Sequence, residues 1–377
     1  MNITVLGGGM VGSAIARDLD REDSFHVTVA DNNPATLQRY AQWNIATRQA
    51  DLDDMAQLAD VITDADLVIG AVPGFMGYRT LQRVIEAGKN IIDISFFPED
   101  PFSLDELAKE RGVTAIMDCG LAPGLGNMLM GRMDADLDRV DSFLCFVGGL
   151  PVVRRKPYEY GAVFSPIDVI EEYTRPARYI EHGAEVVKPA LSDVEQLDLP
   201  GVGTLEAFNS DGLRTLAVTM DAPSMKEKTM RYPGHADLMR ALRDTGFFRK
   251  DPVNVGGHGV VPLDLTAKLL FPAWQMEEGE ADLSVMRIII EGEKDGLRET
   301  HTFDLLDRFD HATGITSMAR TTGYTCSVAA RLVADGRYRR PGISPPEYLG
   351  AEQSSFDALM EGLHDRGIVF EHTMVPG

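Results

Sequence analysis

The stretch ITVLGGGMVG, residues 3–12, is the most informative part of this chain. A short run of β-branched and apolar residues leads directly into the pattern G-x-G-x-x-G, and a helical pattern follows over residues 13–19. In a strand–turn–helix unit Gly7 permits the tight turn, Gly9 lets the backbone approach a pyrophosphate, and Gly12 allows the helix to pack closely on the strand. The stretch therefore predicts a dinucleotide-binding turn.

A second strand pattern, residues 27–30, ends on Asp31 and completes the βαβ order. Met10 and Val11 of the glycine motif are predicted cofactor contacts, and the N-terminal N–H groups and partial positive charge of the helix that follows attract phosphate. The carboxylate of Asp31 is placed to accept hydrogen bonds from ribose hydroxyls. No Arg or Lys follows until Arg39, so a 2′-phosphate beside Asp31 would meet uncompensated like charge. The sequence therefore predicts NAD as cofactor, with NADP disfavoured.

Strand and helix patterns alternate over about the first 120 residues, which predicts an α/β domain with a doubly wound parallel sheet. We expect Ser103 to cap the last helix of this region and Gly112 to end it. The further candidates are strands at 67–70, 90–94 and 114–117, and helices at 78–87 and 103–111.

After about residue 138 separated strand patterns occur without a regular helix after each one, which predicts an α+β substrate domain with a more antiparallel sheet. The predicted domains are 1–125 for NAD binding, 126–315 for substrate and catalysis, and 316–377 as a C-terminal helical segment packing back on the first domain. The candidates in this region are strands at 142–147, 215–220 and 286–291, a loop at 197–203, and helices at 167–173, 235–244 and 317–335.

The composition restricts the function classes. The chain has 377 residues, 44% of them hydrophobic, and a formal charge of −22, so neither nucleic acid nor an anionic membrane is an expected partner. Its three cysteines and eight histidines form no zinc or disulfide pattern, so we expect no metal site. No apolar stretch reaches about 18 residues, the length of a membrane span. We expect a cytoplasmic protein that binds a small molecule and forms a homodimer or a higher homo-oligomer.

Further candidate residues follow the later strands, because ligands of doubly wound sheets gather at the carboxyl ends of strands. Asp93 is predicted to face the nicotinamide or a substrate amine, or to cap a loop. We interpret Cys119 as a small buried side chain, since hydride transfer needs no thiolate. The predicted cofactor contacts in these segments are Ala71, Val72, Pro73, Asp118, Pro123 and Asn127.

Several longer strings point to one family: DCGLAPGLGN at 118–127, GGLP at 148–151, LEAFNSDGLRTL at 205–216, KTMRYPGH at 228–235, and TGY and GISPPE at 322–324 and 342–347. They resemble the saccharopine dehydrogenase-like oxidoreductases, and within them the lysine 6-dehydrogenase branch. The resemblance implies an NAD(P)-dependent enzyme acting on an amine or secondary amine of an amino acid. The leading prediction is NAD-dependent oxidative deamination of the side-chain amine of L-lysine. The alternatives are a saccharopine- or carboxyspermidine-type reductase and an NAD-binding protein without turnover.

The catalytic candidates of the second domain lie in the same strings. His235 is predicted either to accept the proton of the substrate amine or to cap a helix or bind a backbone carbonyl. Arg231 and Arg214 are candidates for a bidentate contact to a substrate carboxylate, with an internal ion pair as the alternative. Lys228 and Tyr232 are acid–base candidates, although for Lys228 a structural or carboxylate contact is the preferred interpretation, because a basic lysine needs a lowered pKa.

Overall fold

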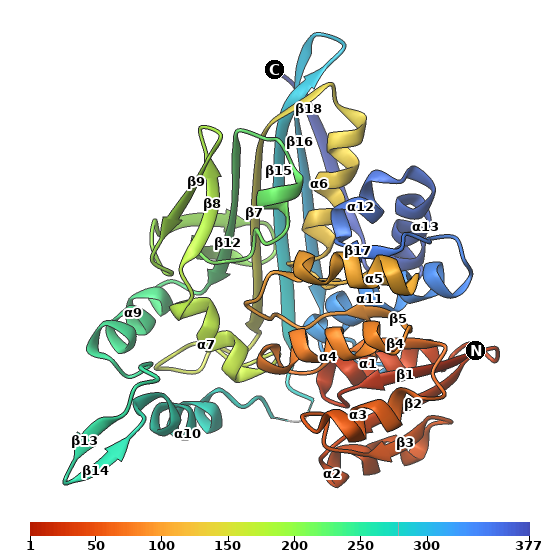
Figure 1. Ribbon diagram of the computed structural model, residues 1–377. Coiled ribbons are helices and arrows are strands. Elements are labelled where there is room, and N and C mark those ends of the chain that lie inside the picture. The colour runs from red at the N-terminus through yellow and green to blue at the C-terminus, as the bar shows by residue number, and fades with distance from the viewer. Residues whose placement is uncertain (278) are drawn as a thin grey trace. The chain divides into compact units, whose positions relative to one another are not determined.

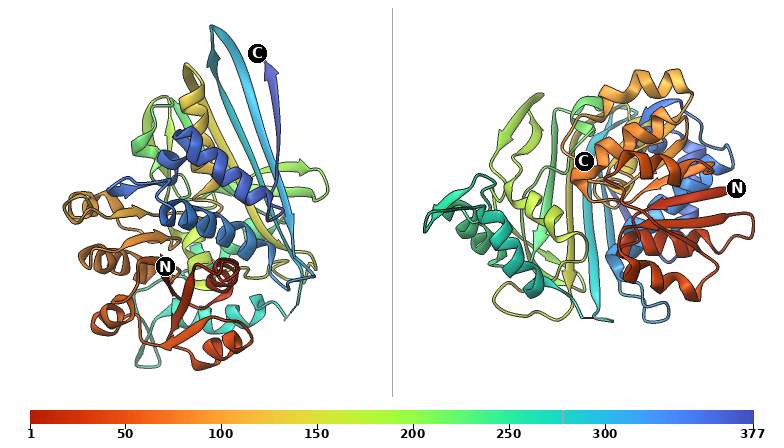
Figure 2. Two further views of the ribbon diagram at one scale, coloured as in Figure 1. Left: turned by 90° about the vertical axis from the view of Figure 1, so that its right-hand side faces the viewer. Right: turned by 60° about the horizontal axis from the view of Figure 1, so that its bottom comes forward.

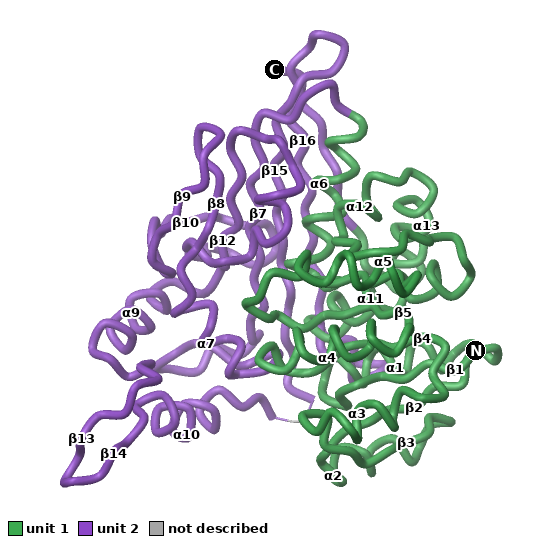
Figure 3. Tube along the Cα trace, in the orientation of Figure 1, with its two compact units in different colours: residues 1–136, 318–369 green, residues 137–317, 370–377 purple. Residues whose placement is uncertain are grey.

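The computed structural model describes residues 1–277 and 279–377, and each of its two compact units contains a large sheet (Figure 1). Unit 1 consists of residues 1–136 and 318–369, and unit 2 of residues 137–317 and 370–377 (Figure 3). Unit 1 therefore combines the N-terminal third of the chain with a later segment.

The described residues of unit 1 form a seven-stranded sheet in the order β17-β6-β5-β4-β1-β2-β3. All neighbouring strands are parallel, and the order 3-2-1-4-5-6 within the sheet is that of a doubly wound dinucleotide fold. The predicted fold class is thus confirmed. The strands are β1 (Asn2–Leu6), β2 (His26–Asp31), β3 (Ala46–Gln49), β4 (Leu67–Gly70), β5 (Asn90–Asp93), β6 (Thr114–Ile116) and β17 (Gly342–Ser344).

Helices α3, α4 and α5 share one core with this sheet. Leu58, Leu81 and Ala108 on the helices pack with Val68 and Ile91 of the strands, and all five are fully buried. Burying each large side chain contributes about 1.5–3 kcal/mol. The helices of this part are α1 (Met10–Leu19), α2 (Pro34–Gln38), α3 (Met55–Ile62), α4 (Gly74–Glu86), α5 (Asp105–Arg111), α6 (Leu125–Asp136), and the 3₁₀ helices η1 (Arg39–Gln42) and η2 (Pro101–Leu104).

The start of the helix before β6 differs from the prediction. The side chain of Asp100 caps η2 by accepting a hydrogen bond from the Phe102 amide at 2.9 Å, and α5 follows without a side-chain cap. The Ser103 hydroxyl instead donates to the Asp100 carbonyl at 2.6 Å, so its predicted capping role is wrong. Gly112 ends α5 in the left-handed conformation, as predicted.

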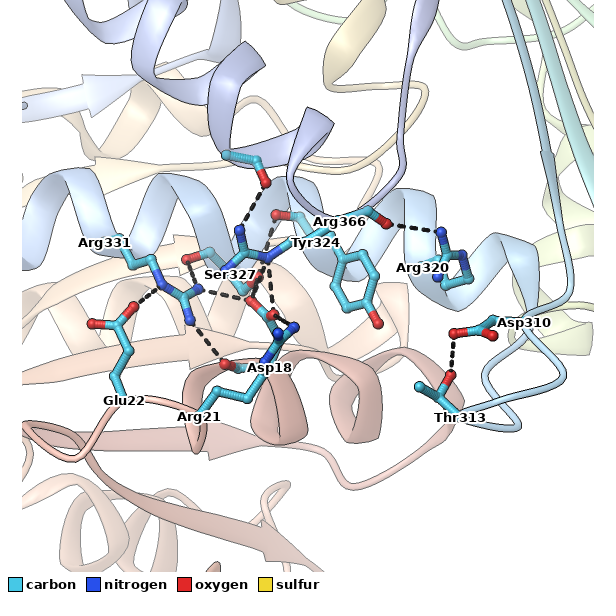
Figure 4. A network of polar contacts seen from close by, with 11 residues as sticks. Asp18, Arg21, Glu22, Asp310, Thr313, Arg320, Tyr324, Ser327, Arg331 and Arg366 are labelled. Carbon is cyan, nitrogen blue, oxygen red and sulfur yellow. Dashed lines mark hydrogen bonds and ion pairs between the residues drawn. The ribbon is translucent and has the colours of Figure 1, made fainter.

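The later part of unit 1 is joined to α1 by a long helix, α11 (Ser317–Ala334). Gly323 allows the close approach, because a Cβ at that position would lie 3.3 Å from the Ala14 side chain. At the other end of α1 the buried Asp18 carboxylate accepts hydrogen bonds from Arg331 at 2.8 Å and from Arg366 at 2.9 Å (Figure 4). Helix α1 is therefore fixed by residues more than 300 positions further along the chain.

The C-terminal segment is not helical throughout. After α12 (Pro346–Ala351) and α13 (Gln353–His364) the chain forms β18 (Phe370–Pro376), which pairs antiparallel with β16 in unit 2 (Figure 2). The strand β17 was also not predicted, since three residues are too few for a periodic pattern.

Unit 2 contains a nine-stranded mixed sheet, described for residues 137–277, 279–317 and 370–377. Its main path is β10-β11-β12-β7-β15-β16-β18, and β8 and β9 extend it from β12. Only the β12–β7 pair is parallel within this described part, so the predicted antiparallel character holds for most of the sheet. The strands are β7 (Arg139–Pro151), β8 (Ala177–Glu181), β9 (Ala184–Lys188), β10 (Glu195–Leu199), β11 (Gly203–Asn209), β12 (Ser224–Arg231), β15 (Asp282–Lys294) and β16 (Leu297–Arg308), with a separate hairpin of β13 (Val253–Val255) and β14 (His258–Val260).

Three helices of unit 2 enclose an aromatic core. Tyr173 of α7, Met239 of α9 and Trp274 of α10 are almost completely buried together with Phe208 of β11. The helices are α7 (Pro166–Thr174), α8 (Leu216–Thr219), α9 (His235–Thr245) and α10 (Pro262–Trp274).

Two predictions for unit 2 are wrong. Residues 215–220 form the single helical turn of α8 instead of a strand, because the Val218 and Thr219 amides donate to the Thr215 carbonyl. The predicted loop at 197–203 contains most of β10, whose alternation of charged and apolar residues suits a half-exposed strand.

Candidate functional site

Of Gly7, Gly9 and Gly12 in the glycine turn of unit 1, only Gly9 has open space where a side chain would begin. Gly7 has φ +106°, and a Cβ there would lie 2.3 Å from the Ala71 carbonyl oxygen. A Cβ on Gly12 would lie 2.0 Å from the Gly7 carbonyl oxygen, whereas nothing lies within 4 Å of a Cβ built on Gly9. Gly7 and Gly12 are thus required by the protein's own packing, and the open side of Gly9 suits a ligand.

The first turn of α1 has the features of a phosphate site. Gly9 occupies the N-cap position, and no side chain caps the helix there. The first N–H groups of the helix, at and after Met10 and Val11, are left for an external acceptor in the direction of the helix dipole. The residues present therefore fit a dinucleotide pyrophosphate.

Asp31 is held at the end of β2 beside this turn. Its carboxylate accepts hydrogen bonds from the Gly8 amide and the Asn33 amide, each at 2.8 Å. The Tyr40 hydroxyl donates to the Gly8 carbonyl at 3.0 Å, and burial raises the pKa of Tyr40 to about 12. These bonds fix both the turn and the acid, and the remaining lone pairs of the carboxylate can serve ribose hydroxyls.

Asp93 lies at the carboxyl end of β5 and is fully buried. It accepts hydrogen bonds from the amide and the hydroxyl of Ser95, at 2.7 and 3.3 Å. Gly70 makes room for it, since a Cβ on Gly70 would lie 1.9 Å from the Asp93 carboxylate. The Cys119 amide donates to the Asp93 carbonyl at 3.0 Å. The structure therefore brings Asp93 next to the segment that begins at Asp118, while Val72 and Pro73 follow β4 on the neighbouring strand.

Residues 118–124 form a compact turn that leads into α6. Asp118 is buried with φ +54°, and the peptide before Pro123 is cis. The Gly124 amide donates to the Asn127 side chain at 3.2 Å, and Asn127 donates in turn to the buried Glu347 carboxylate at 3.2 Å. Glu347 was missed as a site residue because its partner is 220 positions away in the sequence.

Cys119 agrees with its predicted role as a buried small side chain. The residue has no exposed surface, and burial raises the pKa of the thiol, with Asp118 and Asp93 raising it further. The thiolate needed for nucleophilic chemistry is therefore disfavoured.

In unit 2 the strand β12 and the helix α9 place Arg231 and His235 in the aromatic core. Arg231 is 2% exposed, forms an ion pair with Glu172, and donates to the Tyr173 hydroxyl at 3.3 Å. Burial raises the pKa of Glu172, and the Arg231 charge opposes that shift. Glu206 accepts hydrogen bonds from the Gly234 and Ala236 amides at 2.8 and 2.5 Å and so fixes the start of α9.

The environment of His235 does not suit a proton acceptor at neutral pH. Its Nδ1 lies 2.9 Å from the Tyr158 carbonyl, which can only accept, and its Nε2 lies 2.9 Å from the Tyr173 hydroxyl. Both contacts fit a neutral imidazole with the proton on Nδ1. Burial, followed by the nearby Arg231 charge, lowers the pKa of His235 to about 3. The prediction of His235 as the base is therefore disfavoured, and its alternative, a contact to a backbone carbonyl, describes the geometry.

Lys228 and Tyr232 make structural contacts. Lys228 forms an ion pair with Glu195 and donates to the Asp193 carbonyl at 2.8 Å. The Tyr232 hydroxyl donates to the Pro151 carbonyl at 3.0 Å, and the Arg154 guanidinium lies 4.3 Å from its ring centroid. The contacts of Lys228 agree with its structural interpretation. Those of Tyr232 are structural too and do not indicate an acid–base role.

Arg214 is buried in the turn before α8, in the left-handed region with φ +54°. Below this turn lies Glu227 of β12, which sequence reasoning missed. Burial raises the pKa of Glu227 to about 8. The sequence signal for it was a single acid in the strand SMKEKTMR, whose apolar residues are its two methionines.

Residues 1–277 and 279–377 contain no group of three or more His, Cys, Asp or Glu side chains that could hold a metal ion. Over the same residues no helix has both the length and the apolar character needed to cross a membrane.

Comparison with known proteins gives consistent matches over both units. Residues 3–116 match the model of the saccharopine dehydrogenase NADP binding domain, and residues 120–368 match that of the saccharopine dehydrogenase C-terminal domain. The NADP(+)-dependent, L-glutamate-forming saccharopine dehydrogenase of Schizosaccharomyces pombe is 24% identical, over 99% of this chain and 99% of that protein. The carboxyaminopropylagmatine dehydrogenase of a Synechocystis species is 21% identical over 100% and 98%.

A solved structure agrees with the fold. The apo form of the L-Glu-forming saccharopine dehydrogenase from Saccharomyces cerevisiae has a TM-score of 0.80 and 21% identity, and the likeness covers 99% of each chain.

Proposed function

Since this chain belongs to the saccharopine dehydrogenase family of oxidoreductases, we propose that it is a dehydrogenase acting on the C–N bond of an amine that also carries a carboxylate. Two full-length relatives carry names of such compounds, saccharopine and carboxyaminopropylagmatine, and this observation supports the substrate class. The dinucleotide, when bound, supplies the hydride acceptor or donor at its nicotinamide ring. The leading hypothesis is that the substrate is a secondary amine. This amine is oxidised in one direction of the reaction and formed from an amine and a carbonyl compound in the other.

Within this proposal the residues of unit 1 hold the dinucleotide. The turn from Gly7 to Gly12 and the first N–H groups of α1 bind the pyrophosphate, and Asp31 accepts hydrogen bonds from a ribose. Asp93, at the carboxyl end of β5, is the carboxylate that we assign to the substrate amine, because ligands of doubly wound sheets bind at that edge. His235 keeps Tyr173 and the loop carbonyl of Tyr158 in place and moves no proton.

A second candidate is oxidation of L-lysine at its side-chain amine. It rests on the strings at 205–216 and 228–235, which resemble the lysine 6-dehydrogenase branch. Arg231 and His235 of these strings contact the aromatic rings of Tyr160 and Tyr173, and these contacts do not favour one candidate over the other.

For the cofactor we propose NAD, although the matched domain model and the fission-yeast relative are named for NADP. The reason is Asp31, whose carboxylate would repel a 2′-phosphate. Asp31→Asn keeps the shape and removes the charge, so kcat/KM with NADP should rise relative to that with NAD by on the order of tenfold, about 1.4 kcal/mol. Asp51→Asn, an exposed acid after β3, is the matched control and should leave the ratio unchanged. A wild-type preference for NADP would refute the argument.

The experiment that tests the function follows reduced nicotinamide by absorbance. Wild-type protein is mixed with NAD or NADP and, in separate assays, with saccharopine, carboxyaminopropylagmatine, L-lysine or cadaverine. Reverse assays combine NADH or NADPH with L-lysine or agmatine and an oxo-acid or aldehyde. Turnover with a secondary amine alone supports the leading hypothesis, and turnover with L-lysine alone supports the second candidate, oxidation of L-lysine. Dinucleotide binding without turnover of any amine would refute both.

A further inference from the structure

Helix α10 is apolar on its outer face as well as on the face that it buries. Leu263, Leu270 and Trp274 are buried in the aromatic core of unit 2. Leu265 and Leu269, on the opposite side of the helix, are 53% and 65% exposed. A helix that only covers a core carries polar residues on its outer side. The second apolar face of α10 therefore has a cause other than the core of unit 2.

The exposed apolar residues of α10 are aligned. Leu265, Leu269 and Pro272 follow one another at spacings of four and three residues, which places them in one line along the helix surface. All three are exposed, and the exposed Ala273 flanks the end of the line. The outer face of α10 is therefore a continuous apolar stripe rather than a scatter of single residues.

The hairpin of β13 and β14 directly precedes α10 and adds to this surface. It is a separate two-stranded sheet, and such a hairpin is at most marginally stable in water by itself. Val255 is 57% exposed, and Val253 and Val260 are partly exposed. We define the α10 surface as the hairpin residues 253–260 together with the stripe on α10.

Charged side chains are scarce in this part of the chain. Residues 253–275 contain one acid and one base, Asp264 and Lys268, whereas 25% of the whole chain is charged. Loss of charged residues beside exposed apolar ones is typical of the centre of a protein–protein interface. The two charges also cancel, so this surface is neutral in a chain with a formal charge of −22. Two acidic copies can therefore meet here without repulsion between the touching residues.

The positions of the two charges make the α10 surface complementary to itself. Each charged residue directly precedes one of the two exposed leucines, so both lie on the same flank of the stripe. In a symmetric dimer the same patch is used by both copies. Two α10 helices can then pack antiparallel, with Ala267 of each level with a two-fold axis perpendicular to the pair. Leu265 of one copy lies opposite Leu269 of the other.

The same arrangement brings opposite charges together. Asp264 of one copy lies on the same side of the helix pair as Lys268 of the other, two residues or about 3 Å away along the axis. Within the described part of the chain neither side chain has an ion pair or hydrogen bond of its own. The dimer therefore supplies each charge with a partner, and it does so twice because of the symmetry.

We propose that the α10 surface binds the same surface of a second copy of this chain, with the two α10 helices antiparallel about a two-fold axis. A stable dimer buries about 800 Å² on each partner, which is more than one helix offers, so the β13–β14 hairpins take part in the contact. The inference goes beyond the proposed function, because it concerns assembly and uses none of the residues assigned to the dinucleotide or the substrate.

Sedimentation equilibrium of the full chain tests the apolar stripe. The wild type should be dimeric at micromolar concentrations. Leu269→Asp places a carboxylate against Leu265 of the other copy, twice in each dimer, and should raise the Kd of the dimer at least about a hundredfold. Leu297→Asp is the matched control, because Leu297 of β16 is 67% exposed and lies outside the α10 surface. This control should leave the Kd unchanged.

A charge exchange tests the contact between copies directly. Asp264→Lys leaves lysines facing lysines in its homodimer, and Lys268→Asp leaves acids facing acids, so each variant alone should weaken the dimer about tenfold. In an equal mixture of the two variants each copy presents the charges that the other lacks. Native mass spectrometry, with a terminal tag on one variant, should then show mainly the heterodimer.

Three results would overturn the proposal. They are a wild type that stays monomeric, a wild-type oligomer whose Kd Leu269→Asp does not change, and a mixture with no excess of heterodimer over random pairing. Circular dichroism verifies the folding of each variant. If Leu269→Asp does not fold, the charge exchange decides by itself, because it changes only exposed positions. None of these measurements depends on turnover, so a failure here is distinct from a failure of the proposed function.

Discussion

Replacing His235 by Gln should flatten the loss of stability of this protein between pH 7 and pH 5. Burial and the Arg231 charge lower the pKa of His235 to about 3, from an ordinary value of 6.5. Below pH 6.5 the unfolded chain therefore binds a proton that the folded protein does not. The stability linked to the neutral imidazole is complete above pH 6.5 and is lost as the pH falls toward 3.

The size of the effect follows from the shift. Each pH unit within this window costs about 1.4 kcal/mol, so about 2 kcal/mol is lost by pH 5 and about 5 kcal/mol over the whole window. The assay is urea unfolding at pH 5, 6, 7 and 8. His235→Gln is expected to be less stable than the wild type at pH 7, because its contacts to Tyr173 and Tyr158 are weakened. Its free energy of unfolding should nevertheless fall by about 2 kcal/mol less between pH 7 and pH 5.

The other titrating groups act in both proteins and cancel in the difference. His258→Gln, at an exposed position in the β13–β14 hairpin, is the control and should follow the wild-type curve. Parallel curves for His235→Gln and the wild type would refute the reasoning. So would an ionisation near pH 6.5 in kcat/KM that disappears in His235→Gln, because it would show that this imidazole titrates near neutrality.

Two further substitutions test other buried charges. Burial raises the pKa of Glu227 from 4.5 to about 8, so its contribution is present below pH 4.5 and lost as the pH rises through 8. Glu227→Gln should gain on the wild type by up to about 5 kcal/mol in unfolding free energy between pH 5 and pH 9, and a constant difference would contradict this. Asp18→Asn leaves Arg331 and Arg366 without their buried carboxylate and should cost about 3–5 kcal/mol in urea unfolding, whereas the exposed Asp23→Asn should change it by less than about 0.5 kcal/mol.

The parallel sheet was predictable because its signals are local. In β1, the glycine turn and α1 each residue is chosen for its immediate neighbours: β-branched residues for a buried strand, Gly7 for a positive φ, and Gly12 for a close contact five residues away. The same holds for α9 and α11, whose periodic apolar faces gave their bounds to within one residue. Signals of this kind need no knowledge of the rest of the chain.

The wrong predictions occurred where a local preference competed with distant contacts. Residues 215–220 have the composition of a strand, but they follow a turn that is fixed by contacts of Glu227 and Asp211. After that turn the chain forms a single helical turn instead of a strand. β18 was missed because its pairing partner β16 lies some 70 residues earlier and supplies the hydrogen bonds that the segment alone lacks. A strand of this kind exists only in its sheet.

The sequence by itself determined the dinucleotide-binding turn, the acid at the end of β2, the doubly wound sheet and the family, because these depend on residue types at short spacing. The tertiary structure decided what the polar residues do. The string KTMRYPGH reads as a row of catalytic groups, yet burial in unit 2 pairs Arg231 with Glu172 and keeps His235 neutral. The protonation state of a side chain depends on its solvation and on the charges within a few ångströms. The residues that bury His235 and the acid that pairs with Arg231 come from distant parts of the chain, with Glu172 lying 59 positions before Arg231.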